Sequence, residues 1–238
     1  MKKVCLILAV VMMGFVSLVA AQKPFAGTIK IHSHIEGTDD PNILSQGESD
    51  ESVLIFGNCT KVVATMGGGL GQIVITNGDA KNLIQIIDLS AMGMGKYYME
   101  VNADQLAEKM KNIKMDYNYT GEKKNIANYD CEKVVVTVTD LETDESEDLT
   151  LYVSTAINAG DAINFYQYPG LKGYPLRTEV KHDIDGTEIS IIEEATEVIP
   201  SKKVKMVDFM RPSDVQDLKE HPEVLKMLGF GSGDEDDE

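Results

Sequence analysis

Residues 126–139 read IANYDCEKVVVTVT and give the clearest β-strand signal in this 238-residue chain. From Val134 to Val138, alternate positions place three valines on one face, whereas Val135 and Thr137 fall on the other. Successive side chains of a strand point to opposite faces, so this alternation predicts a strand within a sheet. The Asn-Tyr-Asp triplet near its start is typical of a turn.

Similar alternating segments, separated by turn residues, occur on both sides of this strand. Gly57-Asn58, Asn77-Gly78 and Asp185-Gly186 are dipeptides typical of hairpin turns. Residues 36–50 are polar and are predicted to form a loop. The pattern predicts one mainly β domain with a few helices, an α+β fold. The further expected strands cover residues 27–35, 51–57, 60–66, 71–76, 82–88, 96–101, 116–124, 147–154, 174–183 and 187–199.

One internal segment, residues 102–115, has the spacing of an amphipathic helix. Asn102 can cap this helix, with Gln105 in its first turn. The apolar stripe of the helix includes Leu106 and Met110, and we expect this stripe to pack on the sheet.

A last helix is expected to begin at Ser213, which forms a capping-box pattern with Gln216. The His221-Pro222 pair should kink or restart this helix, and Gly229 is a natural C-cap. Residues 231–238, GSGDEDDE, contain nothing to bury and are expected to form a disordered acidic tail.

The N-terminal segment has the features of a secretory signal. Two lysines precede an apolar stretch, and the small residues that end in Ala21 suit cleavage after that position. We therefore expect a soluble exported protein, periplasmic or secreted, of a Gram-negative envelope. Residues 1–21 would be the signal peptide and residues 22–230 a single domain. The alternative is an uncleaved anchor.

The chain is strongly acidic. Its 22 basic and 39 acidic residues give a net charge of −17, and loss of the two lysines of the signal peptide leaves −19. Such a charge makes nucleic acid and anionic membrane surfaces unsuitable partners. No later apolar run is long enough to span a bilayer, so we expect no transmembrane segment after signal cleavage. The protein is expected to be a monomer.

Two cysteines, Cys59 and Cys131, remain after removal of the signal peptide. In an oxidising compartment, two cysteines on neighbouring strands can form a disulfide bond. Connectivity cannot be derived from the sequence, so two separate buried thiols are the alternative.

No catalytic or cofactor motif accompanies these patterns. His32 and His34 share one strand face and could bind a metal ion together, but paired histidines on a strand can also simply face water. Asp140, Glu142 and Asp144 alternate as calcium ligands would, but the glycine and the following helix of a calcium-binding loop are missing. The sequence therefore predicts no metal, no cofactor and no enzymatic activity.

Several short pieces of sequence occur in an order typical of a known family. They are Phe25-x-Gly27-x-Ile29, IIDL at 86–89, KYYME at 96–100, IANYDCEKVVV at 126–136, LYVS at 151–154 and LKGYPLR at 171–177. Through these pieces the chain resembles the exported family of unknown function numbered 4412, which is similar to periplasmic lipoprotein carriers of the LolA/LolB type. The resemblance implies a curved, incompletely closed antiparallel β-barrel, a LolA-like half-barrel, with helices covering its concave side.

Such a half-barrel would have an apolar interior that receives lipid, a lipoprotein acyl chain or another apolar ligand without catalysis. The alternative function is an envelope-associated interaction or sensor domain, and a third is an enzyme that acts on the cell envelope. A groove large enough for an acyl chain would favour the first function. Convergent carboxylates or histidines in that groove would favour the third.

The candidate ligand-binding residues lie on the internal helix and in two segments that combine apolar bulk with glycine or proline neighbours. We expect the two segments to flank one groove mouth, with the helix residues on its floor. The alternative is that both segments are ordinary loops at opposite ends of the barrel. The candidates are Met92, Met94, Leu106, Met110, Phe165, Tyr166 and Tyr168.

Overall fold

The computed structural model describes residues 24–66, 70–158, 165–184 and 187–229. The expected signal peptide, its cleavage site and the expected acidic tail lie outside the described residues. None of the helices in the described part of the chain has the length and apolar character needed to cross a membrane.

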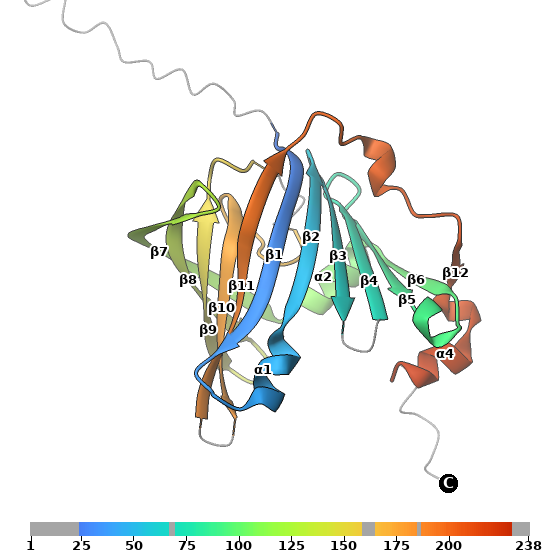
Figure 1. Cartoon of the computed structure of the whole chain (residues 1–238), viewed down its shortest axis with the longest axis horizontal. Coiled ribbons are helices and arrows are strands. Elements are labelled where there is room, and N and C mark those ends of the chain that lie inside the picture. The colour runs from blue at the N-terminus through green and yellow to red at the C-terminus, as the bar shows by residue number, and fades with distance from the viewer. Residues whose placement is uncertain (1–23, 67–69, 159–164, 185–186, 230–238) are drawn as a thin grey trace, which may run out of the picture.

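In the described part of the chain, twelve strands form one curved sheet that does not close into a barrel (Figure 1). The strands are β1 (Ala26–Glu36), β2 (Ser49–Phe56), β3 (Cys59–Met66), β4 (Leu70–Asn77), β5 (Asn82–Asp88), β6 (Lys96–Val101), β7 (Ile113–Ile126), β8 (Tyr129–Asp140), β9 (Glu145–Ser154), β10 (Tyr174–Ile184), β11 (Thr187–Pro200) and β12 (Val215–Asp217). Their order is β12-β6-β5-β4-β3-β2-β1-β11-β10-β9-β8-β7. Neighbours are antiparallel except β12 and β6, which are parallel. The predicted fold class is confirmed.

Strand β1 joins the two halves of the sheet. It pairs with β2 on one side and with β11 on the other, so that Ile29 lies between Val53 and Val198. Ile29 is completely buried, whereas the neighbouring Lys30 is exposed. This is the alternation expected for a strand with one face on a core and the other in solvent.

The apolar core has parts on both faces of the sheet. On the concave face, the completely buried Ile29 and Ile55 belong to one cluster, and the completely buried Val134 and Leu151 belong to another. On the convex face, a cluster that includes Ile86 is covered by the segment that follows β11. This segment contains the short 3₁₀ helix η3 (Met206–Phe209), whose Phe209 is buried.

The internal helix is shorter than expected. It is α2 (Ala103–Met110), and its predicted capping box is present, because the Asn102 side chain accepts from the Gln105 N–H and the Gln105 side chain from the Asn102 N–H, both at 3.0 Å. The expected helical continuation to residue 115 is wrong: from Ile113 the chain is already in β7. Ile113, Met115 and Tyr117 alternate there and pair with β8, which satisfies the backbone groups that a longer helix would have used.

The predicted helix at Ser213 is also wrong. Residues Val215–Asp217 form β12, which pairs with the backbone of β6. The 3₁₀ helix η4 (Leu218–Glu220) follows, and the helix α4 (Pro222–Met227) begins at the predicted restart point. Gly229 has a positive φ of 79°, as expected for a residue that ends a helix.

The expected loop at 36–50 contains the short helix α1 (Pro41–Gly47). The Asp40 side chain caps it by accepting a hydrogen bond from the Asn42 N–H at 2.8 Å. Proline suits the first turn of a helix, because its missing N–H would have no partner there. The sequence carried this Asp-Pro signal, which a purely polar interpretation of the segment overlooked.

The expected disulfide is corrected. Cys59 and Cys131 are both buried and free. They lie on β3 and β8, which are separated in the sheet by five other strands, so their sulfur atoms cannot bond. Cys59 packs on the convex face, where its thiol lies 3.8 Å from the Met206 sulfur, and burial raises the pKa of Cys131 to about 11.

We expect Ile29→Ala to lower the free energy of unfolding by about 2–5 kcal/mol, because it empties a completely buried site beneath the strand that joins the two halves. The matched control is Lys30→Ala, the next residue on the same strand. Its 2.7 Å ion pair with Glu197 is exposed, so the loss should be about 1 kcal/mol or less. Urea denaturation measures both, and equal losses would contradict the assigned faces.

Candidate functional site

A cavity of about 330 Å³ lies on the concave side of the sheet. Its wall is formed by inward-facing residues of β1 to β5, β10 and β11, and residues 166–168 close it from the other side. The apolar part of the wall includes Ile31, Val53, Val62, Val74 and Leu83. The polar part includes Gln72, Gln85, Thr60, Thr76, Glu51 and Glu193. The cavity is therefore amphipathic rather than purely apolar.

Two glutamates enter this cavity from opposite sides of β1. Glu51 of β2 lies opposite Ile31, and Glu193 of β11 lies opposite Ser33, so the two carboxyls are offset by two residues along β1. Both side chains face inward with the apolar positions of their own strands. Burial raises the pKa of Glu51, and the negative charge of Glu193 raises it further. Burial alone raises the pKa of Glu193, although water in the cavity still reaches its side chain.

Tyrosines complete the polar part of the site. Tyr174 is buried, and burial followed by the charges of Glu51 and Glu193 raises its pKa. Burial also raises the pKa of Tyr168; a hydrogen bond with Thr178 opposes this effect, and the nearby Glu193 adds to it. Tyr166 lines the same cavity. The phenols of Tyr168 and Tyr174 therefore remain neutral hydrogen-bonding groups at neutral pH.

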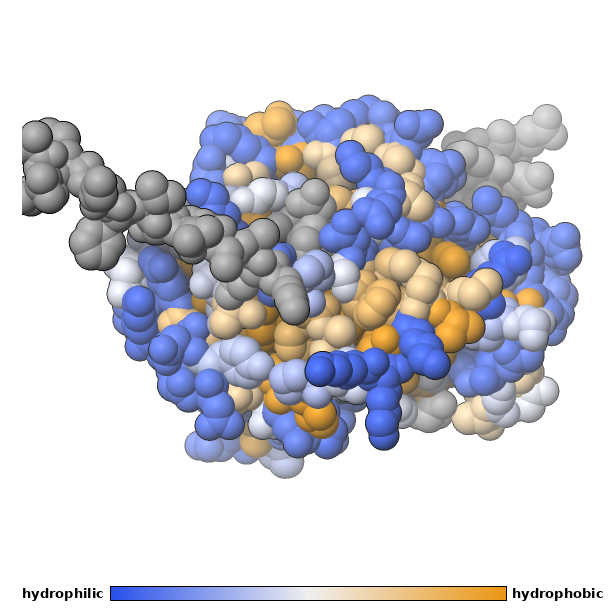
Figure 2. All heavy atoms as spheres, turned by 90° about the horizontal axis from the view of Figure 1, so that it is seen from above, coloured by the Kyte–Doolittle hydropathy of each residue, from blue (hydrophilic) through white to orange (hydrophobic). Residues whose placement is uncertain are grey.

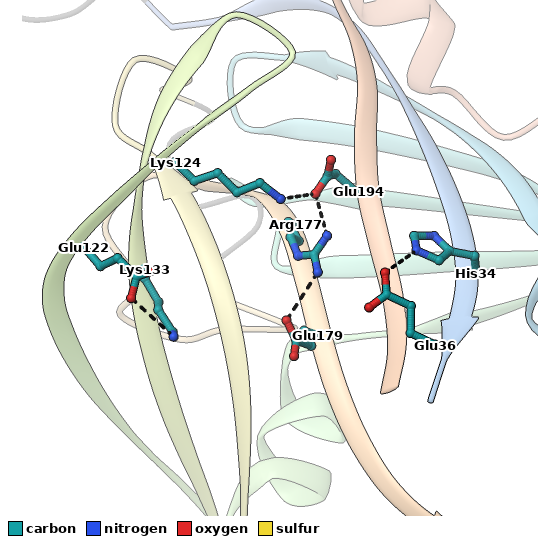
Figure 3. A network of polar contacts seen from close by, with 8 residues as sticks. All are labelled: His34, Glu36, Glu122, Lys124, Lys133, Arg177, Glu179 and Glu194. Carbon is teal, nitrogen blue, oxygen red and sulfur yellow. Dashed lines mark hydrogen bonds and ion pairs between the residues drawn. The ribbon is translucent and has the colours of Figure 1, made fainter. Parts of the chain in front are cut away.

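On the convex face, by contrast, a glutamate is paired with two cationic side chains (Figure 3). Glu194, the residue after Glu193, accepts hydrogen bonds from Arg177 at 2.6 Å and from Lys124 at 2.8 Å. Burial alone would raise the pKa of Glu194, but these two cations lower it. Arg177 also pairs with Glu179 at 3.4 Å. Adjacent residues of β11 thus place one unpaired carboxyl in the cavity and one paired carboxylate outside.

The structure brings four of the seven candidate residues together. Leu106 of α2 packs with Leu83 and Val101, and Phe165 packs against the same cluster. Tyr166 and Tyr168 line the cavity directly. This group borders one side of the cavity, where α2 lies behind the sheet in Figure 1.

The methionine candidates lie elsewhere. Met94 packs against a separate cluster that contains Leu218 and Val224 of the C-terminal region. Met92 is in the short 3₁₀ helix η2 (Ser90–Met92) and is 56% exposed. Met110 is half-buried at the end of α2 and belongs to none of the described clusters. None of these three methionines belongs to the described lining of the cavity.

Sequence reasoning missed Glu51 and Glu193. A signal was present, because Glu51 is in phase with Val53 and Ile55, and Glu193 is in phase with Ile191 and Ala195. An acidic residue at an inward position of an apolar strand is informative, since burying a carboxyl without a partner is unfavourable.

The residues considered as metal ligands in the sequence make ordinary contacts with neighbouring residues. His32 stacks on His34, pairs with Asp50 at 3.0 Å and lies 3.4 Å from Glu48. Asp140 accepts a hydrogen bond from the Glu142 N–H at 2.8 Å, as in an ordinary turn. Within the described ranges, no group of three or more His, Cys, Asp or Glu side chains is placed to hold a metal ion.

The end of the sheet at which β1 begins carries apolar side chains in the middle of its surface and hydrophilic side chains around them (Figure 2). Together with the cavity, this defines the class of the molecule: an open, curved β-sheet module with a partly covered concave side.

Two solved structures are similar to this chain. One is the structure of PNGF-II in space group C2, with a TM-score of 0.50 and 15% sequence identity, over 84% of this chain and 33% of the PNGF-II chain. The other is the crystal structure of MucB, with a TM-score of 0.35 and 9% identity, over 79% of this chain and 58% of MucB. The chain thus spans about a third of PNGF-II. The first likeness supports the fold, and the second is too distant to carry an argument.

No protein-family model matches the chain, and no curated protein matches it. Membership of family 4412 or of the LolA/LolB carriers is therefore not confirmed. The curved, incompletely closed sheet that the resemblance implied is present.

Glu193→Gln and Glu194→Gln should change stability in opposite directions at about pH 7. The raised pKa of Glu193 means that its stabilising contribution is complete below the unfolded value of 4.5 and is lost as pH rises through the folded pKa. The lowered pKa of Glu194 means that its contribution is present above 4.5 and is lost as pH falls. We therefore expect the first variant to be more stable than the wild type and the second to be less stable.

Urea denaturation at about pH 7 and about pH 4 measures both effects, which should shrink in the acidic buffer. A loss of stability for Glu193→Gln at neutral pH would contradict the inward, unpaired position of its carboxyl.

Proposed function

We propose that the protein is an exported, non-catalytic binding module that holds a small ligand with an apolar body in its concave cavity. A lipid or a lipoprotein acyl chain belongs to this class of ligand. The observation that carries the proposal is the cavity of about 330 Å³ between the apolar strand faces and the tyrosines of residues 166–168. Small-molecule pockets occupy roughly 300–1,000 Å³, so the space suits one modest ligand.

The proposal also includes the cellular location of the protein. The N-terminal sequence has the features of a cleaved secretory signal, and the acidic composition favours a soluble state. We therefore place the module in the periplasm or outside the cell.

Binding is preferred over catalysis for a physical reason. Glu51 and Glu193 are convergent carboxyls, which is the feature that would favour an enzyme. However, an acid–base pair works when the two environments push the pKa values apart. Here both pKa values move in the same direction, upward, because partial desolvation raises each of them and no cationic side chain lines the described part of the cavity. Two carboxyls whose pKa values shift in the same direction suit recognition of a ligand better than a division into acid and base.

An interaction role is the second candidate. Met206, Val207 and Met210 are 50%, 62% and 64% exposed on the segment that crosses the convex side. Exposed apolar residues that lie close together are typical of protein contacts. This surface lies away from the concave cavity, so the two roles are compatible in one molecule.

The test is the binding of a neutral fluorescent apolar probe, N-phenyl-1-naphthylamine, followed by the rise in its emission. Ala64→Phe should weaken binding about tenfold or more, because Ala64 lines the cavity and a ring there fills it. Val63→Phe is the matched control, since Val63 is 41% exposed and points to the other face of β3. Equal binding by both variants, or no binding by the wild type, would reject the proposal.

A further inference from the structure

The carboxyls of Glu51 and Glu193 lack a polar partner within the described ranges. Among the described residues, neither side chain takes part in a hydrogen bond or an ion pair. This contrasts with the other face, where Glu194 contacts both Arg177 and Lys124. Partly desolvated carboxyls that have no partner are unfavourable unless something else supplies the missing donors.

The described lining of the cavity provides no cationic side chain that could pair with these carboxyls. It contains no lysine, arginine or histidine. The remaining polar groups are the neutral side chains of threonine, glutamine and tyrosine. Because the whole chain also carries a net charge of −17, its field adds to the negative potential of the cavity. An anionic headgroup such as a fatty-acid carboxylate would therefore be repelled.

Three tyrosines line the same cavity as the two carboxyls. Tyr174 lies close enough to Glu51 and Glu193 to feel both charges, and Tyr168 feels that of Glu193. Tyr166 is the third tyrosine of the cavity lining. Aromatic faces attract cations through the ring quadrupole, and quaternary ammonium groups are recognised in this way. The apolar wall of Val53, Val62 and Val74 provides contact for an aliphatic body.

We propose that the cavity selects a cationic amphiphile, with its ammonium group between Glu51 and Glu193 and its aliphatic body along the valine wall. This inference rests on the proposed function and specifies the ligand class for the same site. It differs from a general apolar carrier, because the two carboxyls set the sign of the charge that the ligand bears.

The proposal has a pH dependence of known sign. A bound cation favours the ionised carboxyls, so its affinity should rise as pH rises through the titration of Glu51 and Glu193. Among the described residues, the titratable groups that face this pair are Tyr168 and Tyr174, whose raised pKa values keep them neutral at neutral pH. The two glutamates are therefore the groups that titrate in the acidic range.

The experiment compares three ligands with the same decyl chain by isothermal titration calorimetry, below their micelle concentrations. They are decyltrimethylammonium, decanol and decanoate. At about pH 7 the purified protein should bind the cation at least about tenfold more tightly than decanoate, with decanol between them. At about pH 4 the preference for the cation over decanol, which does not ionise, should shrink, and decanoate is left out there because it becomes protonated.

The double variant Glu51→Gln/Glu193→Gln should lose the preference for the cation while it still binds decanol. Glu194→Gln is the matched control, and it should keep the preference because its side chain is outside the cavity. Circular dichroism verifies that each variant is folded.

The outcomes separate the two proposals. Binding of decanol and of the naphthylamine probe without discrimination between the charged ligands overturns the cation proposal alone. A preference for decanoate, or a preference for the cation that survives in the double variant, also overturns it. Failure of all these ligands to bind rejects the proposed function together with the cation proposal.

Discussion

The sheet is continuous because its first strand pairs with its eleventh. On one side of β1 the chain runs as the meander β2 to β6, and on the other side as the meander β7 to β11. Only the backbone hydrogen bonds of β1 to β2 and β11 connect them within the sheet. Glu51 and Glu193 belong to different meanders and share one cavity because β1 lies between them. The position of the site is thus a consequence of this long-range pairing.

Much of the fold could be predicted from local sequence patterns. The expected strands at 82–88 and 96–101 have the observed bounds, because alternation and turn residues act over short distances. Residues 110–117 were ambiguous, since Met110 and Ile113 fit a helix while Ile113, Met115 and Tyr117 fit a strand. The pairing with β8 decides between them. Likewise, Val215–Asp217 is a strand because β6 lies beside it, which no local pattern indicates.

The site was less predictable than the fold. The aromatic segment at 165–168 could be identified from its composition, and it does border the cavity. Met92 and Met94 were expected at the same groove mouth as the aromatic segment, because both segments combine apolar bulk with glycine or proline neighbours. The C-terminal region packs over Met94 instead. Among 39 acidic residues, Glu51 and Glu193 are in phase with apolar positions of their own strands, but only the strand order shows that they share one cavity. Cys59 and Cys131 show the same limit, because similarity of chemistry does not imply proximity.

The two lateral edges of the sheet differ in how they prevent self-association. On one edge, β12 covers part of the backbone of β6. On the other, β7 is long and largely exposed, but its pairing with β8 is interrupted between Tyr119 and Lys123, around Gly121 with its φ of 78°. Irregular backbone and exposed lysines oppose the addition of a strand from another molecule. Among the described strands, the long edge of β7 is therefore divided into two shorter segments, on which a second copy would template aggregation less readily.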